Sequence, residues 1–169
     1  MNKKTKKIVL AALMAALTCI TTMVVTVPSP LSGYLNLGDC IVLCSGWLLG
    51  PVYGFAAAGL GSALADLFAG YVTYAPATFV IKGLMAVIAY FIFKLLCKKL
   101  GNIAARIISA LVAEIVMVGG YYVFESFLYS NFATPVANIP ANGIQGLAGL
   151  IAGVLLINIF EKINRKVIK

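Results

Sequence analysis

Residues 59–83 read GLGSALADLFAGYVTYAPATFVIKG, which has the pattern of one apolar helix ending, a short loop, and a second apolar helix beginning at Pro76. An acidic residue, Asp66, stands just before this loop, and a basic residue, Lys82, stands just after it. Both lie in segments whose other side chains suit a lipid bilayer. Ionisable groups at membrane depth are costly unless they are paired or hydrated, so they point to function. We therefore expect a pair of membrane-spanning helices with a functional polar site near their connection.

Composition places the whole chain in the membrane. Of its 169 residues, 62% are hydrophobic and 11% are charged, and its mean hydropathy is +1.03. Soluble domains are nearer half apolar and a quarter charged. Helical spans of ~20 residues leave room for about five to seven crossings. The net charge of +8 reports orientation rather than a nucleic-acid partner, because every Lys and Arg except Lys82 lies near a terminus or in residues 94–106.

We predict an all-α polytopic membrane protein with a single domain over residues 1–169 and six transmembrane helices. The predicted spans are 8–27, 39–50, 52–70, 76–97, 104–129 and 140–160. The first apolar run is long for a signal peptide, and no small-x-small cleavage site precedes Pro28, so a retained span is favoured. Asp39 is well placed to cap the second helix, and Gly50-Pro51 separates that helix from the third.

Six spans place every basic cluster on the same side of the membrane. With the N-terminus in the cytoplasm, the basic connection at 94–106 and the C-terminus are also cytoplasmic. The three outer loops, near residues 28–38, 71–75 and 130–139, contain no Lys or Arg. Five or seven spans would turn one terminal basic cluster outward.

Several kinds of chemistry find no support in the sequence. Histidine is absent, and the four cysteines, Cys19, Cys40, Cys44 and Cys97, lie in apolar segments without a CxxC motif. A zinc site usually needs four nitrogen or sulfur ligands, so we expect no metal and no other cofactor. The Gly59-Leu-Gly61 pair lacks the third glycine and the preceding strand of a nucleotide-binding fingerprint.

Polar side chains from four predicted helices gather in the outer third of the membrane. At 1.5 Å per residue, Asp66 and Glu125 lie about 6 Å below the outer ends of their spans, and Lys82 lies roughly 9 Å down its span. Asn142 and Gln145 share one face of the last span, roughly 3 to 8 Å from its outer end. The inner halves of the helices are nearly all apolar, so this pattern predicts a pocket open to the outside rather than a polar channel.

Each of these residues also has a structural interpretation. Asp66 and Lys82 are as readily explained by mutual neutralisation across the hairpin as by ligand binding. Asn142 and Gln145 could join helices by hydrogen bonds, whereas Glu125 has no obvious partner and favours a ligand role.

The outer tyrosines and Glu114 can also be interpreted either structurally or functionally. Tyr74 and Tyr122 belong to a set of outer tyrosines typical of the membrane interface, although both could stack on an aromatic solute. Glu114 lies deeper than the other acids, and a structural role is favoured for it.

Small residues mark the first span. Ala11, Ala12, Ala15 and Ala16 form two overlapping pairs with i, i+4 spacing, and small residues let helices in lipid approach closely. The face formed by these alanines suits either packing inside the protein or docking of a partner subunit.

Five motifs, in order, give the chain a resemblance to a known family. They are GYLNLGD at 33–39, LGPVYG at 49–54, GSALAD at 61–66, YAPATFVIKG at 74–83 and IPANGIQ at 139–145. Together they resemble the substrate-binding S components of energy-coupling factor (ECF) transporters, in the branch of the riboflavin, pyridoxine and hydroxymethylpyrimidine types. Each motif is weak alone, but their order and spacing cover nearly the whole chain.

The resemblance implies a six-helix vitamin-binding subunit of a bacterial plasma membrane, without ATPase activity of its own. It also implies a transmembrane coupling subunit and two cytoplasmic ATPases as partners, with an Ala-x-x-x-Ala docking motif at Ala11/Ala15 or Ala12/Ala16. The chain contains no Walker-type Gly-x-x-x-x-Gly-Lys. Pyridoxine, a hydroxymethylpyrimidine and a flavin remain candidate ligands, with a one-ring vitamin preferred from the resemblance alone.

Two other classes of protein were weighed against a transporter subunit. A membrane-embedded enzyme could use Asp66, Glu125 and Lys82 for acid–base chemistry, but the sequence has no His, no metal-ligand cluster and no Gly-x-Ser-x-Gly. A membrane assembly factor would leave the outer polar cluster without a purpose.

Overall fold

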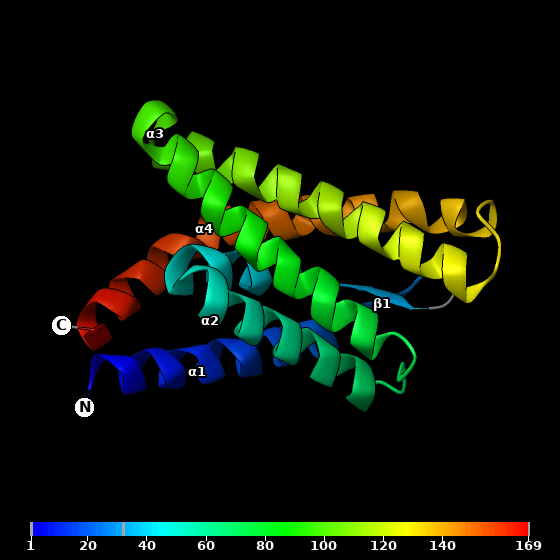
Figure 1. Ribbon diagram of the computed structural model, residues 1–169, viewed down its shortest axis with the longest axis horizontal. Helices are drawn as coiled ribbons and strands as arrows, with labels where there is room; N and C mark the ends of the chain where they lie inside the picture. Colours follow the sequence, from blue (N-terminus) through cyan, green and yellow to red (C-terminus); the bar gives the residue numbers. More distant parts are fainter. Residues whose placement is uncertain (1, 32, 169) are drawn as a thin grey trace.

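Four long helices make up most of the protein, whose computed structural model describes residues 2–31 and 33–168 (Figure 1). Helix α1 spans Lys3–Val24, α2 spans Asp39–Phe68, α3 spans Ala75–Leu128 and α4 spans Ile139–Ile168. All four are long and apolar enough to cross a membrane. The prediction of a mostly helical membrane protein is therefore confirmed.

Helices α2 and α3 are each broken once, by a glycine with positive φ. Gly50 has φ 80° and Gly101 has φ 78°, a region of backbone conformation that costs glycine little and other residues more. Pro51 follows the first break, where its missing N–H does no harm because a new helical segment begins there. Figure 1 shows the chain turning back at both breaks. The connections expected at Gly50-Pro51 and between residues 97 and 104 are thus sharp breaks rather than loops.

Helix α1 begins five residues before its predicted start. The side chain of Asn2 accepts a hydrogen bond from the Lys4 N–H at 3.2 Å and caps the helix. The basic lead-in to the apolar run is therefore helical. At its other end α1 stops at Val24, three residues before the predicted boundary.

Two of the predicted outer loops contain regular structure. Strands β1 (Thr26–Pro28) and β2 (Tyr34–Asn36) pair antiparallel between α1 and α2, and the 3-10 helix η1 (Thr134–Asn138) precedes α4. Figure 1 shows β1, the α2–α3 turn and the α3–η1 connection at one end of the bundle, with both chain termini at the other end.

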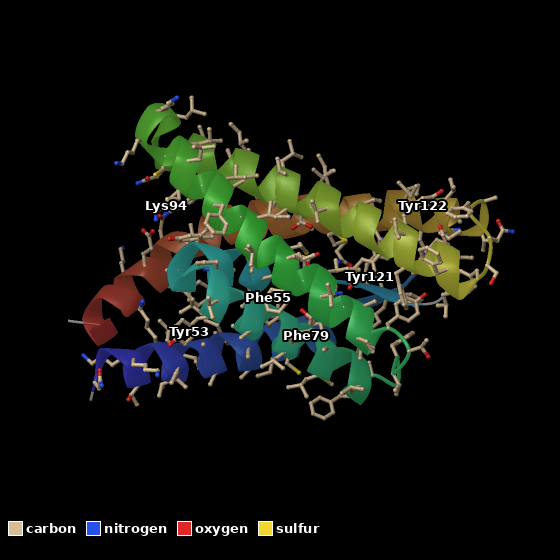
Figure 2. The ribbon with its side chains drawn as sticks, in the orientation of Figure 1. Tyr53, Phe55, Phe79, Lys94, Tyr121 and Tyr122 are labelled. Atoms are coloured by element: carbon tan, nitrogen blue, oxygen red, sulfur yellow. The ribbon has the colours of Figure 1, made fainter. Side chains whose placement is uncertain are left out.

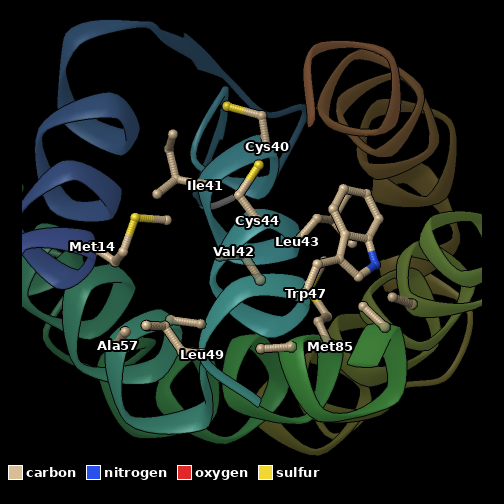
Figure 3. Packing of buried hydrophobic residues seen from close by; sticks show 14 of the residues in the cluster. Met14, Cys40, Ile41, Val42, Leu43, Cys44, Trp47, Leu49, Ala57 and Met85 are labelled. Carbon is tan, nitrogen blue, oxygen red and sulfur yellow. The ribbon is translucent and has the colours of Figure 1, made fainter. Parts of the chain in front are cut away.

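The first segment of α2 forms the centre of the core. Val42, Leu43 and Cys44 have no exposed surface, and Figure 3 shows side chains such as Met14 and Met85 packed around this segment. Gly46 lies directly against the backbone of α3, because a Cβ there would fall 2.2 Å from the Ala86 carbonyl oxygen. Such close packing needs small residues.

The outer surfaces of the helices are also apolar. Val52 is 75% exposed and Leu155 is 70% exposed. Helices that are apolar on every side are typical of proteins in lipid, which agrees with the composition.

Candidate functional site

A cavity with an empty volume of about 440 Å³ lies at the end of the bundle that carries the β1–β2 hairpin. Its walls come from the hairpin, the end of α2, both segments of α3, η1 and the start of α4. The lining residues are Ser29, Gly33, Tyr34, Asn36, Asp66, Tyr71, Tyr74, Thr78, Tyr121, Glu125, Asn138, Asn142 and Gln145.

Asp66 presents a carboxylate to this cavity from the last turn of α2. The residue is 6% exposed, and Oδ1 accepts a hydrogen bond from the Tyr34 hydroxyl at 2.9 Å. The other oxygen, Oδ2, has no hydrogen-bond partner among the described residues. A buried carboxylate oxygen without a partner is costly, which makes Asp66 a candidate ligand contact.

Glu125 presents a second carboxylate from the end of α3. Its Oε1 accepts hydrogen bonds from Asn138 Nδ2 at 2.8 Å and from the Tyr74 hydroxyl at 3.3 Å. Asn138 is itself held by the Ser29 hydroxyl, which donates to its Oδ1 at 2.6 Å. Oε2 of Glu125 has no partner in the part of the chain that the structure describes. Two acidic groups therefore each leave one oxygen unsatisfied at the same cavity.

Lys82 is paired with Asp39, which corrects two of the sequence interpretations. Its Nζ donates to Asp39 Oδ1 in a fully buried ion pair, so the neutralising pair between Asp66 and Lys82 does not form. Asp39 is the first residue of α2 and was expected to cap it, but its carboxylate is occupied by Lys82 and by Gln145. The Lys82 ammonium also lies 5.5 Å from the centre of the Tyr121 ring, a cation–π distance. Lys82 does not line the cavity.

Gln145 connects this ion pair to the cavity and the hairpin. Its Nε2 donates to Asp39 Oδ2 at 2.6 Å, and its Oε1 accepts from the Asn36 backbone N–H at 3.0 Å. One amide group thus joins α4, the start of α2 and strand β2. Asn142, one turn earlier on α4, lines the same cavity.

Aromatic rings supply much of the remaining wall. The Tyr34 and Tyr71 rings lie 5.0 Å apart, and Tyr74 meets Phe124 edge-on at 5.2 Å. Such rings can hold a flat ligand, since aromatic pairs favour offset or edge-on contacts.

The structure places the two candidate tyrosines differently. Tyr74 lines the cavity, whereas the Tyr122 hydroxyl donates to the Phe132 carbonyl at 3.1 Å, away from it. Tyr121 takes the cavity position instead, and its hydroxyl lies 3.1 Å from that of Thr78 (Figure 2). Helical spacing indicates that Tyr121 rather than Tyr122 faces the cavity, because Tyr121 stands one turn before Glu125 and so shares its face.

Sequence reasoning also missed cavity residues that lie in the connections. Tyr34 and Asn36 belong to β2, and Asn138 belongs to η1. The sequence analysis assigns these residues to loops and proposes none of them as a ligand contact. Tyr34 enters it only as one of the outer tyrosines and, with Asn36, as part of the motif GYLNLGD.

The alanines of α1 point in two directions. Ala11 and Ala15 pack against the core, and Gly61 of α2 approaches so closely that a Cβ there would lie 2.4 Å from the Ala15 carbonyl oxygen. Ala12 and Ala16 are exposed, on a face turned about 100° around the helix axis from that of Ala11 and Ala15.

The sequence matches a known family over nearly its full length. Residues 2–162 match the profile described as "ECF-type riboflavin transporter, S component". The chain belongs to this family. Membership confirms the resemblance drawn from the motifs and assigns the chain to transporter components rather than to membrane enzymes.

Two relatives of this S component differ in how they are described. A protein of Pyrococcus woesei described as "Uncharacterized protein in gap 3'region" is 38% identical over 135 residues, covering 79% of this chain and 87% of the relative. The "Thiamine precursor transporter HmpT" of Lactococcus lactis subsp. cremoris is 26% identical over 163 residues, covering 95% of this chain and 91% of the relative.

Solved structures share the fold of this S component. One, described as "Structure and mechanism of the S component of a bacterial ECF transporter", has a TM-score of 0.75 at 23% identity and covers 95% of this chain and 98% of its own. Another, the S component for biotin from an ECF-type ABC transporter, has a TM-score of 0.68 at 22% identity. This match covers 97% of the present chain and 93% of the biotin protein. At these identities the likeness establishes the fold alone.

Proposed function

We propose that this S component captures a small heteroaromatic vitamin or vitamin precursor that carries hydrogen-bond donors. One observation carries the proposal: Asp66 and Glu125 line the same cavity, and each has one carboxylate oxygen without a partner among the described residues. A ligand with donors on two sides would satisfy both oxygens, and the tyrosine rings would hold its flat face.

The charge of the cavity narrows the ligand class. Lys82 is committed to Asp39 and lies outside the lining, so the cavity walls carry acids without a facing base in the described chain. A phosphate or carboxylate group would meet like charge there. Amino or hydroxyl substituents on an uncharged or cationic ring fit better, which favours a hydroxymethylpyrimidine or pyridoxine over phosphorylated compounds. The name of the Lactococcus lactis relative, a thiamine precursor transporter, agrees with this class.

The proposed assembly follows the family. The protein would cross the plasma membrane of a bacterium with six helices and with both termini in the cytoplasm, so that the cavity faces outward. It would join a transmembrane coupling subunit and two cytoplasmic ATPases, which supply the energy. Ala12 and Ala16 are the proposed docking pair, because they are exposed while Ala11 and Ala15 are used inside the protein.

A ligand panel tests the proposal on the purified protein. Thermal unfolding would be followed with a hydroxymethylpyrimidine, pyridoxine and riboflavin, each beside its phosphorylated form, and with biotin as a carboxylate. We expect one of the unphosphorylated donor-bearing rings to raise the unfolding temperature and its phosphate ester to have no effect. A larger shift with a phosphate ester or with biotin would contradict the proposed ligand class, and recovery of a chemically altered ligand would indicate an enzyme.

A further inference from the structure

Asn138 joins the hairpin to one of the two acids of the cavity. It is the last residue of η1, it lines the cavity, and it is 2% exposed. Its Oδ1 accepts hydrogen bonds from the Ser29 hydroxyl at 2.6 Å and from the Leu31 backbone N–H at 3.3 Å. Its Nδ2 donates to Glu125 Oε1 at 2.8 Å. A single buried side chain therefore bridges the connection between β1 and β2 and the end of α3.

The chemistry of these partners allows the Asn138 amide only one orientation. A backbone N–H can only donate and an ionised carboxylate can only accept, so the amide oxygen must face Leu31 and the amide nitrogen must face Glu125. Turned by 180°, the amide would place its nitrogen against the Leu31 N–H and its oxygen against the Glu125 carboxylate. Both hydrogen bonds would then be lost inside a buried site, where unpaired polar groups are costly.

This orientation determines how Glu125 presents its carboxylate. Asn138 Nδ2 and the Tyr74 hydroxyl both donate to the same oxygen, Oε1, whereas Oε2 has no partner among the described residues. Rotating the carboxylate would carry Oε1 away from Asn138, so the amide fixes the direction in which Oε2 points. Supporting hydrogen bonds of this kind hold the groups of a binding site in their productive geometry.

A second amide with the same arrangement provides a comparison. Gln145 accepts a hydrogen bond from the Asn36 backbone N–H and donates one to Asp39. Asp39, however, is bonded to Lys82 and does not line the cavity. Of the two amides, Asn138 is the one whose acid lines the cavity and keeps an oxygen without a partner in the described chain.

We infer that Asn138 is a positioning residue of the binding site, which orients the Glu125 carboxylate so that Oε2 meets a hydrogen-bond donor of the ligand. Asn138 supports binding through Glu125 and not merely by holding the hairpin. The inference rests on the proposed function, because it takes Glu125 as a contact of the captured ring compound.

Exchanging the polar groups of this pair tests the inference. Asn138→Asp keeps an acceptor for Ser29 and Leu31 but sets a second oxygen against Glu125 Oε1, so the bond that orients Glu125 is lost. Glu125→Gln keeps an oxygen toward Asn138, which turns its NH2 group toward the donor of the ligand. We expect each single variant to bind the most effective ring compound of the ligand panel about tenfold more weakly, the effect of one hydrogen bond to a charged group. Isothermal titration calorimetry on purified protein measures these affinities.

The double variant Asn138→Asp/Glu125→Gln should recover most of the affinity. The new amide at position 125 can donate to the new carboxylate at position 138, and its carbonyl oxygen is then left for the ligand. The Tyr74 hydroxyl tolerates this exchange, because a hydroxyl can accept as well as donate. We expect the double variant to bind about tenfold more tightly than either single variant. If Asn138 only held the hairpin, the losses from the two substitutions would add.

Asn131→Asp is the matched control for the added charge. Asn131 is exposed and lies outside the cavity lining. Its Oδ1 accepts hydrogen bonds from the Ala133 and Thr134 N–H groups, which a carboxylate can also accept. This variant should keep the affinity of the unaltered protein. Thermal unfolding shows which variants fold, and if Asn138→Asp does not, the comparison of Glu125→Gln with the double variant still decides.

The outcomes separate this inference from the proposed function. A double variant that binds no better than the weaker single variant, or an Asn138→Asp variant with unchanged affinity, would overturn the inference and leave the proposed function in place. An equal loss in Asn131→Asp would also overturn it, because charge alone would then explain the effect. If the unaltered protein binds none of the ring compounds, the proposed function fails and this inference fails with it.

Discussion

At the scale of single residues, the two acids of the cavity should determine ligand binding. Glu125→Ala removes Oε2, which has no partner among the described residues. We therefore expect it to weaken binding of the best ring compound by roughly 30-fold or more, the effect of losing ~2–5 kcal/mol from a buried charged hydrogen bond. Isothermal titration calorimetry on purified protein measures this loss. Tyr122→Phe is the matched control, because the Tyr122 hydroxyl contacts the Phe132 carbonyl away from the cavity. Equal affinity in both variants would place the ligand elsewhere.

Lys82 should act on stability rather than on ligand contact. Lys82→Met leaves Asp39 buried without its counter-charge, and breaking a buried ion pair in this way typically costs ~3–5 kcal/mol. We expect a large drop in unfolding temperature in detergent. Adding Asp39→Asn to that variant should recover part of the loss, because it removes the uncompensated charge.

The acid partner of Lys82 can be distinguished in the same experiment. If Asp39 is the partner, Asp66→Asn should not recover the stability lost in Lys82→Met. Recovery by Asp66→Asn, and none by Asp39→Asn, would show that the ion pair lies across the α2–α3 hairpin after all.

These residues show where sequence reasoning ends. Depth along each span could be calculated, and Asp66, Tyr74, Glu125, Asn142 and Gln145 do line one cavity. The sequence did not allow us to calculate the rotation of each helix about its axis or the contacts between distant segments. Asp39 and Lys82 are 43 residues apart in sequence, and nothing local distinguishes an acid that caps a helix from one that pairs with a distant lysine.

At the scale of elements, helix α1 should have one face for stability and one for assembly. Ala12 is exposed, so Ala12→Trp should leave folding and ligand affinity nearly unchanged while it abolishes uptake in cells that supply the coupling and ATPase subunits. A bulky residue there prevents close approach of a partner helix. Radiolabelled ligand uptake and binding to purified protein separate the two effects. Normal uptake by Ala12→Trp would show that this face is not the docking surface.

Ala15→Trp supplies the contrast on the same helix. Ala15 lies against Gly61 of α2, so the larger side chain overpacks the core, which typically costs ~1–3 kcal/mol or more. We expect stability, binding and uptake to fall together in this variant. Intact stability would mean that Ala11 and Ala15 do not pack inside the protein.

Elements were predictable to the extent that hydropathy specifies them. The apolar runs correctly predicted the long helices, and Gly50-Pro51 correctly predicted the break within α2. The β1–β2 hairpin was not predicted, because each strand has three residues, β1 itself ends in Pro28, and the sequence around Gly33 resembles any loop rich in turn residues. A contact from a distant element also holds the hairpin, because Gln145 of α4 accepts a hydrogen bond from the Asn36 N–H.

At the scale of the whole molecule, orientation in the membrane decides whether the cavity can collect a solute from outside. Both chain termini and the break at Gly101 lie at the end of the bundle opposite the β1–β2 hairpin (Figure 1). The basic residues gather at that same end, near the termini and in residues 94–106. Basic segments stay in the cytoplasm, so charge and architecture together predict that the cavity faces outward.

Cysteine labelling of intact cells tests this orientation directly. In a variant with Cys19, Cys40, Cys44 and Cys97 replaced, a single cysteine would stand either at Ser130, beside the cavity end, or at Asn102, next to the Gly101 break; both positions are exposed. A membrane-impermeant maleimide should label the cysteine at Ser130 in intact cells and the cysteine at Asn102 only after the membrane is opened. The reverse pattern would place the cavity on the cytoplasmic side, where a binding site for an imported solute would be open to the compartment that receives it. Capture from outside would then be excluded, whatever the affinity of the purified protein.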